Sequence, residues 1–281
     1  MDIDLILKIG GSSISNKRLL AKALKSQSPD DIKVALAVNK QNIDRIAAEI
    51  GELYSSGIKK MIILTGVGSP GHFVVLQHGI HKGNSGNINQ HLGLVDAQIA
   101  VNLLRQTLLE AFVANKIPVV QLYASSIYES NKMRIIRGDT SNFERFIQNG
   151  IVPVISGDVV PDLSMGYSVL SGDQILLDLV KHFIPQKIIF GSDVDGVFNE
   201  DPKINPAANL IPEIPHSRIN EVIEQVSSGD ASGQMKGKLV EIRNLLDLGQ
   251  KEIILLNITR KGALLEAVTN NSGRSTRFHS K

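Results

Sequence analysis

The sequence predicts an α/β fold, a three-layer sandwich in which helices cover both faces of an open, mostly parallel central sheet. Two observations support this prediction. Short apolar runs alternate along the chain with longer segments of helical period, and glycine-rich turns follow several of these runs. Strands that alternate with helices form parallel sheets covered on both faces. Because ligands of such sheets collect beyond the carboxyl ends of the strands, the glycine turns mark the expected site.

The predicted elements follow one another without an internal repeat or a long linker. The first strand is expected at residues 5–9, and a helical segment follows up to Gly57, with a break at residues 26–31, where SQSPDD is typical of a turn. Further strands are expected at residues 61–64, 117–122, 151–156, 187–190 and 252–256, with hairpin arms at 132–137 and 167–170. Further helices are expected at residues 92–115, 219–226, 235–248 and 264–269.

The composition narrows the class of protein. The 281 residues are 42% apolar and 21% charged, which is ordinary for a globular protein with a large core. A net charge of +2 without a dense block of Lys or Arg gives no reason to expect a nucleic-acid partner. The sequence has no cysteine, no apolar run near the ~18 residues of a membrane helix, and no basic region of a signal peptide at its start. We therefore expect a cytoplasmic protein with no membrane partner.

The stretch that follows the second predicted strand carries the clearest sign of a ligand site. The strand ends in Gly66-Val67-Gly68, and glycines allow a ligand to approach the backbone closely. Ser69 then stands where an N-cap is expected, and Pro70 at a first helical position, which tolerates a missing N–H. The stretch therefore predicts a helix that begins directly after a glycine turn.

Gly71 and His72 are expected in the first turn of that helix, where backbone N–H groups have no partner inside the helix and favour an anion. His72 would add an imidazole donor, so the junction predicts a site for a small anion such as a phosphate. Junctions of this kind are also common without a ligand, and a single histidine is more often structural. The functional interpretation therefore depends on other segments of the chain.

Five more segments combine turn residues with lysine or aspartate. They contain Lys8, Gly10, Gly11, Ser12 and Lys17; Gly157 and Asp158; Ser171, Gly172 and Asp173; Asp193, Asp195, Gly196, Val197, Phe198, Pro202 and Lys203; and Gly233 and Lys238. In order and character, the six segments resemble the amino acid kinase superfamily over nearly the whole chain. That superfamily includes acetylglutamate, aspartate, uridylate, isopentenyl phosphate and fosfomycin kinases.

Within the superfamily, the glycine loop followed by Gly71 and His72 is most similar to the isopentenyl phosphate kinases and their fosfomycin kinase relatives. The sequence departs from that branch at two places. Thr65 and Val67 interrupt what is usually a histidine followed by three glycines, and the segment at residues 17–41 is longer than the branch leads us to expect. Both departures lie near the acceptor side, so they bear on the choice of substrate.

The resemblance implies an ATP-dependent kinase, with Mg²⁺ carried by the phosphates of ATP and no metal site of the protein's own. The implied acceptor is a small phosphate monoester, isopentenyl phosphate first, with isopentenyl diphosphate as its product. A phosphonate of the fosfomycin type, or another superfamily substrate such as UMP, is the alternative. From a different class, the chain could be a nucleotide-binding sensor without catalysis.

The resemblance also implies the organisation of the molecule. Residues 1–183 would form the acceptor-binding lobe and residues 184–281 the nucleotide-binding lobe, sharing one continuous sheet. A homodimer is implied, with the helix at residues 92–115 as a plausible contact. An apolar pocket built by residues 76–80 and 92–99 would suit a five-carbon chain, whereas a short polar pocket would suit a phosphonate.

Individual roles follow from the same resemblance. Lys8, Lys17 and Lys238 would contact phosphates, Asp173 would hold the lysine heads, and His72 would hold the acceptor phosphate. Without the resemblance, the lysines would be interpreted as surface residues, Asp173 as a carboxylate at the start of a helix, and Asp158 as a turn residue. The implied ATP-binding residues are Lys8, Gly10, Gly11, Ser12, Asp193, Asp195, Gly196, Val197, Phe198, Pro202, Lys203, Gly233 and Lys238. The implied substrate-binding residues are Gly66, Val67, Gly68, Gly71, His72, Gly157 and Asp158.

Overall fold

The computed structural model describes residues 1–281 except 17–18, 201, 203, 230–233, 270–272 and 281. Its described strands form a central sheet in the order β12-β14-β13-β9-β1-β2-β6-β3. Neighbouring strands are parallel, except for the antiparallel pair β13 and β14. The strands are β1 (Asp2–Ile9), β2 (Met61–Thr65), β3 (Val119–Tyr123), β6 (Val152–Ser156), β9 (Ile184–Ser192), β12 (Glu213–Pro215), β13 (Glu252–Asn257) and β14 (Ser275–His279). The predicted open, mostly parallel sheet is confirmed.

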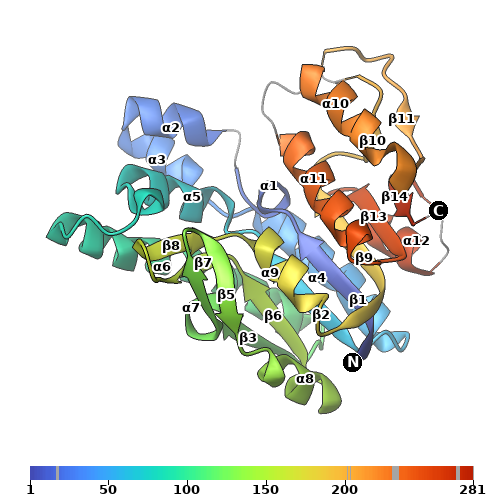
Figure 1. The fold of residues 1–281 in the computed structure, drawn as a ribbon, viewed down its shortest axis with the longest axis horizontal. Helices are drawn as coiled ribbons and strands as arrows, with labels where there is room; N and C mark the ends of the chain where they lie inside the picture. Colours follow the sequence, from blue (N-terminus) through green and yellow to red (C-terminus); the bar gives the residue numbers. More distant parts are fainter. Residues whose placement is uncertain (17–18, 201, 203, 230–233, 270–272, 281) are drawn as a thin grey trace.

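Helices cover both faces of this sheet (Figure 1). Successive side chains of a strand point to opposite faces, so in β1 the side chain of Ile6 joins one core and those of Leu5 and Leu7 join the other. The first core is completed by α8 (Ser141–Gln148), α9 (Gly172–Leu179), α10 (Ile219–Gly229) and α11 (Gln234–Asp247). The second is completed by α4 (Lys40–Ser55), α6 (Ile88–Ala114) and α12 (Ala263–Thr269). The predicted three layers are therefore present.

A smaller sheet of order β5-β4-β7-β8 extends from the carboxyl end of β6. It contains two antiparallel hairpins, β4–β5 and β7–β8. The predicted arm at residues 132–137 lies in the first hairpin, and the predicted arm at residues 167–170 lies in the second. Its strands are β4 (Tyr128–Asn131), β5 (Arg134–Gly138), β7 (Asp158–Asp162) and β8 (Gly166–Leu170). The other short elements are α1 (Gly11–Ile14), α7 (Ala124–Ile127), η2 (Ile80–Lys82), η3 (His216–Arg218), β10 (Val197–Phe198) and β11 (Leu210–Ile211).

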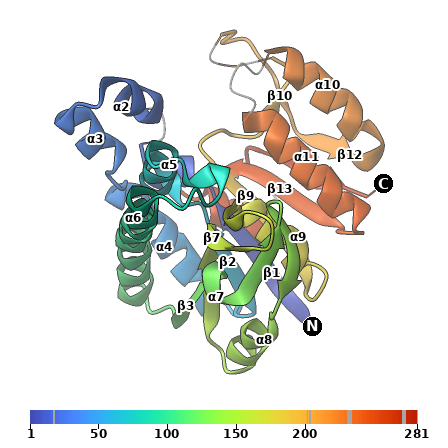
Figure 2. The same cartoon turned by 60° about the vertical axis from the view of Figure 1, so that its left-hand side comes forward.

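Three helices pack against one another next to the start of α6. These are α2 (Leu20–Ser26), α3 (Pro29–Ala35) and α5 (Gly68–Gln77), and α5 begins at the glycine junction that follows β2. They share a small apolar cluster with α6, and Figure 2 shows α2 and α3 beside α5. The predicted break at residues 26–31 separates α2 from α3, where the Ser28 hydroxyl accepts a hydrogen bond from the Asp31 N–H at 3.2 Å.

The long helix α6 begins four residues before the predicted start at Leu92, because the Asn87 side chain caps it by accepting from the Asn89 N–H at 2.8 Å. Two neighbouring leucines of this helix lie on different faces: Leu104 is buried in the core, whereas Leu103 is 61% exposed. None of the described helices is long and apolar enough to cross a membrane.

Candidate active site

The carboxyl ends of β1 and β2 open into a cavity of about 330 Å³. Its lining includes twelve of the residues predicted for the site, which come from five separate segments of the chain. They are Lys8, Gly10, Gly11, Ser12, Gly66, Val67, Gly71, His72, Gly157, Asp158, Asp173 and Lys238. The fold thus brings the glycine turns together at one edge of the sheet, as expected for parallel strands.

Two glycine loops touch each other at the base of this cavity. A Cβ atom on Gly66 would lie 2.5 Å from the Gly11 nitrogen, and one on Gly11 would lie 2.8 Å from the Gly68 nitrogen. Ser15 ties the loops together, since its hydroxyl donates to the Gly11 carbonyl and accepts from the Ser69 N–H, both at 2.8 Å. Only residues without a side chain allow the loops after β1 and β2 to approach so closely.

The predicted start of α5 needs a correction. The helix begins at Gly68, and Ser69 lies inside it rather than at its N-cap. The Gly71 N–H donates to the Val67 carbonyl at 3.2 Å, so it is not one of the partnerless donors that we expected there. The cap comes from Ser15, a residue 54 positions away, instead of from the helix's own first residues.

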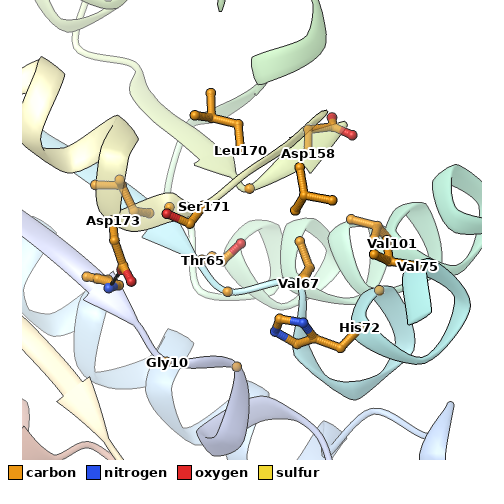
Figure 3. Close-up of a pocket in the computed structure, with 18 of the residues that line it drawn as sticks. Gly10, Thr65, Val67, His72, Val75, Val101, Asp158, Leu170, Ser171 and Asp173 are labelled. Carbon is orange, nitrogen blue, oxygen red and sulfur yellow. Dashed lines mark ion pairs between the residues drawn. The ribbon is translucent and has the colours of Figure 1, made fainter. Parts of the chain in front are cut away.

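His72 lies in the second turn of α5 and lines the cavity. Figure 3 shows its imidazole projecting from α5 toward the middle of the site, between Asp173 on one side and Val75 and Val101 on the other. The side chain is therefore placed where it could donate to a ligand that spans the cavity.

Lys8 lies at the carboxyl end of β1 and is held between two carboxylates. It forms an ion pair with Asp173 at the start of α9, and its Nζ lies 3.1 Å from Oε2 of Glu241 on α11. The ammonium group also lies 5.0 Å from the centre of the Phe190 ring. Only 14% of the Lys8 side chain is exposed, so it is not a solvated surface lysine.

Asp173 is both a carboxylate at the start of a helix and a partner of a lysine, the two interpretations that the sequence left open. It stands in the first turn of α9, which Ser171 caps by accepting from the Gln174 N–H at 3.3 Å, and it contacts Lys8. Sequence reasoning missed Glu241. A usable signal was its position three residues after Lys238 in a helix, because residues at that spacing share one face.

The other end of the cavity is apolar. The expected contribution of residues 76–80 is wrong, since Leu76 is 42% exposed and Val75 faces the cavity instead. The helix at 92–115 contributes as expected, although with only part of the predicted 92–99 segment. Figure 3 shows Val75 and Val101 on the side of the cavity away from Asp173. The lining also includes the apolar side chains of Ala97, Val159, Val169 and Leu170, together with Gln98.

Asp158 lines the cavity, yet its carboxylate is bound by a side chain that sequence reasoning overlooked. Oδ2 of Asp158 lies 2.8 Å from a terminal guanidinium nitrogen of Arg105 on α6. Arg105 is 3% exposed and stands between Leu104 and Leu108 on the buried face of the helix. A charge on a buried apolar face is the signal that could have predicted an ion pair here.

Several predicted nucleotide-binding residues lie outside the cavity lining. Asp193 accepts a hydrogen bond from Ser12 at 2.9 Å, so it lies next to the first glycine loop. Asp195 pairs with Arg274 at 2.7 Å and accepts from Asn257 at 3.0 Å. The other predicted nucleotide-binding residues outside the lining are Gly196, Val197, Phe198 and Pro202, and Gly68, which was predicted for the substrate, also lies outside it. Lys17, Lys203 and Gly233 lie outside the described residues.

The fold and cavity define a class of α/β protein with lysines and glycine loops around a cavity at the carboxyl ends of its strands. Residues 5–257 match the amino acid kinase family, and the chain belongs to that family. An isopentenyl phosphate kinase from Methanothermobacter thermautotrophicus is 32% identical, with 99% of each chain covered. One from Arabidopsis thaliana is 30% identical over 72% of this chain and 65% of its own. The crystal structure of an isopentenyl phosphate kinase matches with a TM-score of 0.75 and 30% identity, covering 97% of this chain and 99% of that one.

Proposed function

We propose that this protein catalyses the ATP-dependent phosphorylation of isopentenyl phosphate to isopentenyl diphosphate. The observation that carries the proposal is the two-ended cavity. Lys8 and Lys238 line it together with glycine loops that suit phosphates, and small apolar side chains such as Val75, Ala97 and Val101 line its other end. The full-length similarity to isopentenyl phosphate kinases supports the same substrate.

Phosphoryl transfer spreads charge over the transferred group, so catalysis depends mostly on positioning and on cations. Lys8 and Lys238 would hold the β- and γ-phosphates of ATP, with Asp173 and Glu241 fixing the head of Lys8. Mg²⁺ bound to the phosphates would neutralise part of their charge. An acceptor phosphate oxygen attacks the γ-phosphorus, and the bond from that phosphorus to the bridging oxygen of ADP breaks.

The acceptor needs no general base. A phosphate monoester has a second pKa of about 6 and is largely dianionic at pH 7, so its attacking oxygen carries no proton to be removed. His72 would donate a hydrogen bond to the acceptor phosphate and stabilise the charge on it during transfer. The apolar end would hold the five-carbon chain and exclude water.

A panel of acceptors tests the proposal. ADP release is measured with isopentenyl phosphate, UMP, fosfomycin and N-acetylglutamate, and we expect the highest kcat/KM with isopentenyl phosphate. His72→Ala should lower kcat/KM for the acceptor about 100-fold, as expected for loss of one charge-stabilising donor, while the KM for ATP stays within about twofold. The exposed His182 provides the matched control, His182→Ala. Absence of turnover with every phosphate monoester would rule the proposal out.

We also propose that residues 1–183 bind the acceptor and residues 184–281 bind the nucleotide, in a cytoplasmic homodimer joined through α6. Five apolar side chains on one face of α6 support the dimer, because each is between 50% and 65% exposed. They are Ile88, Leu92, Val95, Ile99 and Leu103. Contiguous exposed apolar surface of this kind is typical of an interface.

The oligomeric state tests this part of the proposal. Leu103→Glu should convert the dimer to a monomer in size-exclusion chromatography with light scattering, because it places a charge within an apolar contact. Leu163→Glu is the control, since Leu163 is 67% exposed and lies in the β7–β8 turn. A monomeric wild-type protein at micromolar concentration would contradict the proposal.

A further inference from the structure

The cavity wall contains a carboxylate that is poorly suited to an anionic ligand. Asp158 lines the same cavity as His72. Salt screens charges that are buried or partly buried much less than exposed ones, and even in solution the screening length at 0.1 M ionic strength is about 10 Å. An uncompensated Asp158 would therefore repel a dianionic acceptor held at His72.

Arg105 compensates this carboxylate from the back of the cavity wall. Its Nη2 donates to Asp158 Oδ2 at 2.8 Å and to the Gly157 carbonyl at 3.4 Å. Its Nε donates to the Ser156 hydroxyl at 2.9 Å. The guanidinium thus contacts three consecutive residues at the point where β6 ends and β7 begins.

The arginine itself is held rigidly. Its Nη1 donates to Asn102 Oδ1, one turn earlier on α6, at 2.9 Å, and the guanidinium lies 4.9 Å from the centre of the Tyr123 ring. The side chains of Arg105 and Asp158 are 4% and 6% exposed. Burial of a charge is unfavourable unless that charge is paired and hydrogen-bonded, and each guanidinium nitrogen of Arg105 has an acceptor.

We propose that Arg105 is a positioning residue for the acceptor phosphate: it fixes the turn at residues 156–158 and neutralises Asp158, so that the cavity accepts a dianion. The proposal rests on the proposed function for the identity of the acceptor. Arg105 is not one of the residues that line the cavity, whereas Asp158 and Gly157 are, so it acts through them. The same helix turn carries Val101 to the apolar end of the cavity, so one segment of α6 shapes both parts of the acceptor site.

The proposal predicts opposite effects for the two members of the ion pair. Arg105→Met leaves the Asp158 charge uncompensated, so the KM for isopentenyl phosphate should rise about tenfold or more. Asp158→Asn leaves the positive charge beside the site, so the KM for the acceptor should stay within about twofold or fall. A pair that served stability alone would give weaker acceptor binding from either change.

The double variant Arg105→Met/Asp158→Asn gives the sharpest test. Like Arg105→Met, it lacks the guanidinium contacts to Ser156 and Gly157. Because the uncompensated charge is gone, its increase in log KM for the acceptor should be at most half of that in Arg105→Met. The KM for ATP should stay within about twofold in all three variants. Arg134→Met, at an exposed position on β5, is the control for the arginine-to-methionine change.

The outcomes separate the possibilities. Equal increases in KM for both substrates, or a double variant no better than Arg105→Met, would overturn the role of Arg105. If Arg105→Met fails to fold, Arg105→Lys replaces it, and its positive charge should limit the increase in acceptor KM to about threefold. Lack of turnover by the wild type with isopentenyl phosphate would instead reject the proposed function. Calorimetric binding of inorganic phosphate would then test Arg105: binding should weaken in Arg105→Met but not in Asp158→Asn.

Discussion

Lys8 depends on two acidic side chains from different parts of the chain. Asp173 belongs to the α9 helix that follows β8, and Glu241 belongs to α11, 233 residues after Lys8. Two carboxylates around one ammonium restrict its position more than a single partner does, because the head group then has less freedom to turn. Glu241 is 9% exposed, so its contact with Lys8 is largely shielded from solvent.

Glu241→Gln tests whether this second carboxylate matters for the reaction. The change keeps the shape of the side chain and one acceptor oxygen but removes the charge that attracts Lys8. We expect kcat to fall about tenfold, with the KM for the acceptor within about twofold, since Lys8 is expected to act on the phosphates of ATP. Steady-state kinetics measure both values. Glu224→Gln, on the exposed side of α10, should match the wild type, and an unchanged kcat in Glu241→Gln would show that Asp173 suffices.

At the scale of single elements, the contact between the two glycine loops fixes how β1 and β2 present the site. The Gly66 N–H donates to the Ile9 carbonyl at 2.8 Å, which continues the β1–β2 pairing into the loops. A side chain at Gly66 would meet backbone atoms of Gly11 at 2.5 and 2.9 Å. Backbone atoms cannot swing away as a flexible side chain can, so the loops themselves would have to separate.

Gly66→Ala should therefore lower the free energy of unfolding by about 1–3 kcal/mol and greatly reduce turnover. Thermal unfolding and the ADP-release assay measure the two effects. Gly237→Ala is the control for stability. A Cβ at Gly237 meets nothing within 4 Å, and alanine favours the helix α11, so the melting temperature should be equal or higher. A Gly66→Ala protein as stable as the wild type would show that the loops adjust easily.

The β4–β5 hairpin depends on one aspartate from outside it. Lys132 and Met133 form its two-residue turn with φ values of 49° and 63°, which side chains other than glycine rarely adopt. Asp162 accepts from their N–H groups at 3.1 and 2.9 Å. Desolvation raises the pKa of the Asp162 carboxyl, but donors from Met133, Met165, Ser130 and Lys132 together lower that pKa well below its usual range.

The lowered pKa predicts how stability depends on pH. An aspartate has a pKa of about 3.9 in the unfolded chain. Since the folded value is lower, Asp162 contributes its stability above pH 4, and the contribution is lost as pH falls toward the folded pKa. Asp162→Asn should thus lower the free energy of unfolding by about 1–3 kcal/mol at pH 7 and by less at pH 3, as measured by urea denaturation. Asp2→Asn, at an exposed position, is the control, and an equal loss at both pH values would contradict the prediction.

At the scale of the whole molecule, the proposed lobes meet along the pairing of β1 with β9. This pairing divides the central sheet in two. Residues 1–183 supply the strands on one side, β1, β2, β6 and β3, and residues 184–281 supply those on the other, β9, β13, β14 and β12. Both apolar cores contain residues from each part. Lys8 stands at the carboxyl end of this seam, so the site depends on the two parts remaining together.

We therefore expect residues 1–183 alone not to fold cooperatively. Without β9, strand β1 becomes an open edge, and apolar side chains that now face α11 and α12 are left in water. Circular dichroism and thermal unfolding of the fragment, beside the full chain, measure this. A cooperative transition in the fragment would show that the first lobe is an independent domain.

Much of the fold follows from local patterns. Apolar runs and glycine turns identified the central strands other than β12 and β14, and the rim at their carboxyl ends, because both signals depend on residues within a few positions of one another. The resemblance to the amino acid kinase superfamily is confirmed by the family match and the full-length relatives. Individual site roles stay predictions, although twelve of the predicted residues share one cavity.

By itself, the sequence determined the layers of the molecule and the turns that line its site. Tertiary structure decided three details: the cap of α5 by Ser15, the compensation of Asp158 by Arg105, and the contact of Lys8 with Glu241. The partners in these contacts are 54, 53 and 233 positions apart. Hydrophobic periodicity repeats every few residues and reports which side of an element is buried, whereas a hydrogen bond or ion pair depends on which distant side chain the folded chain brings within about 3 Å.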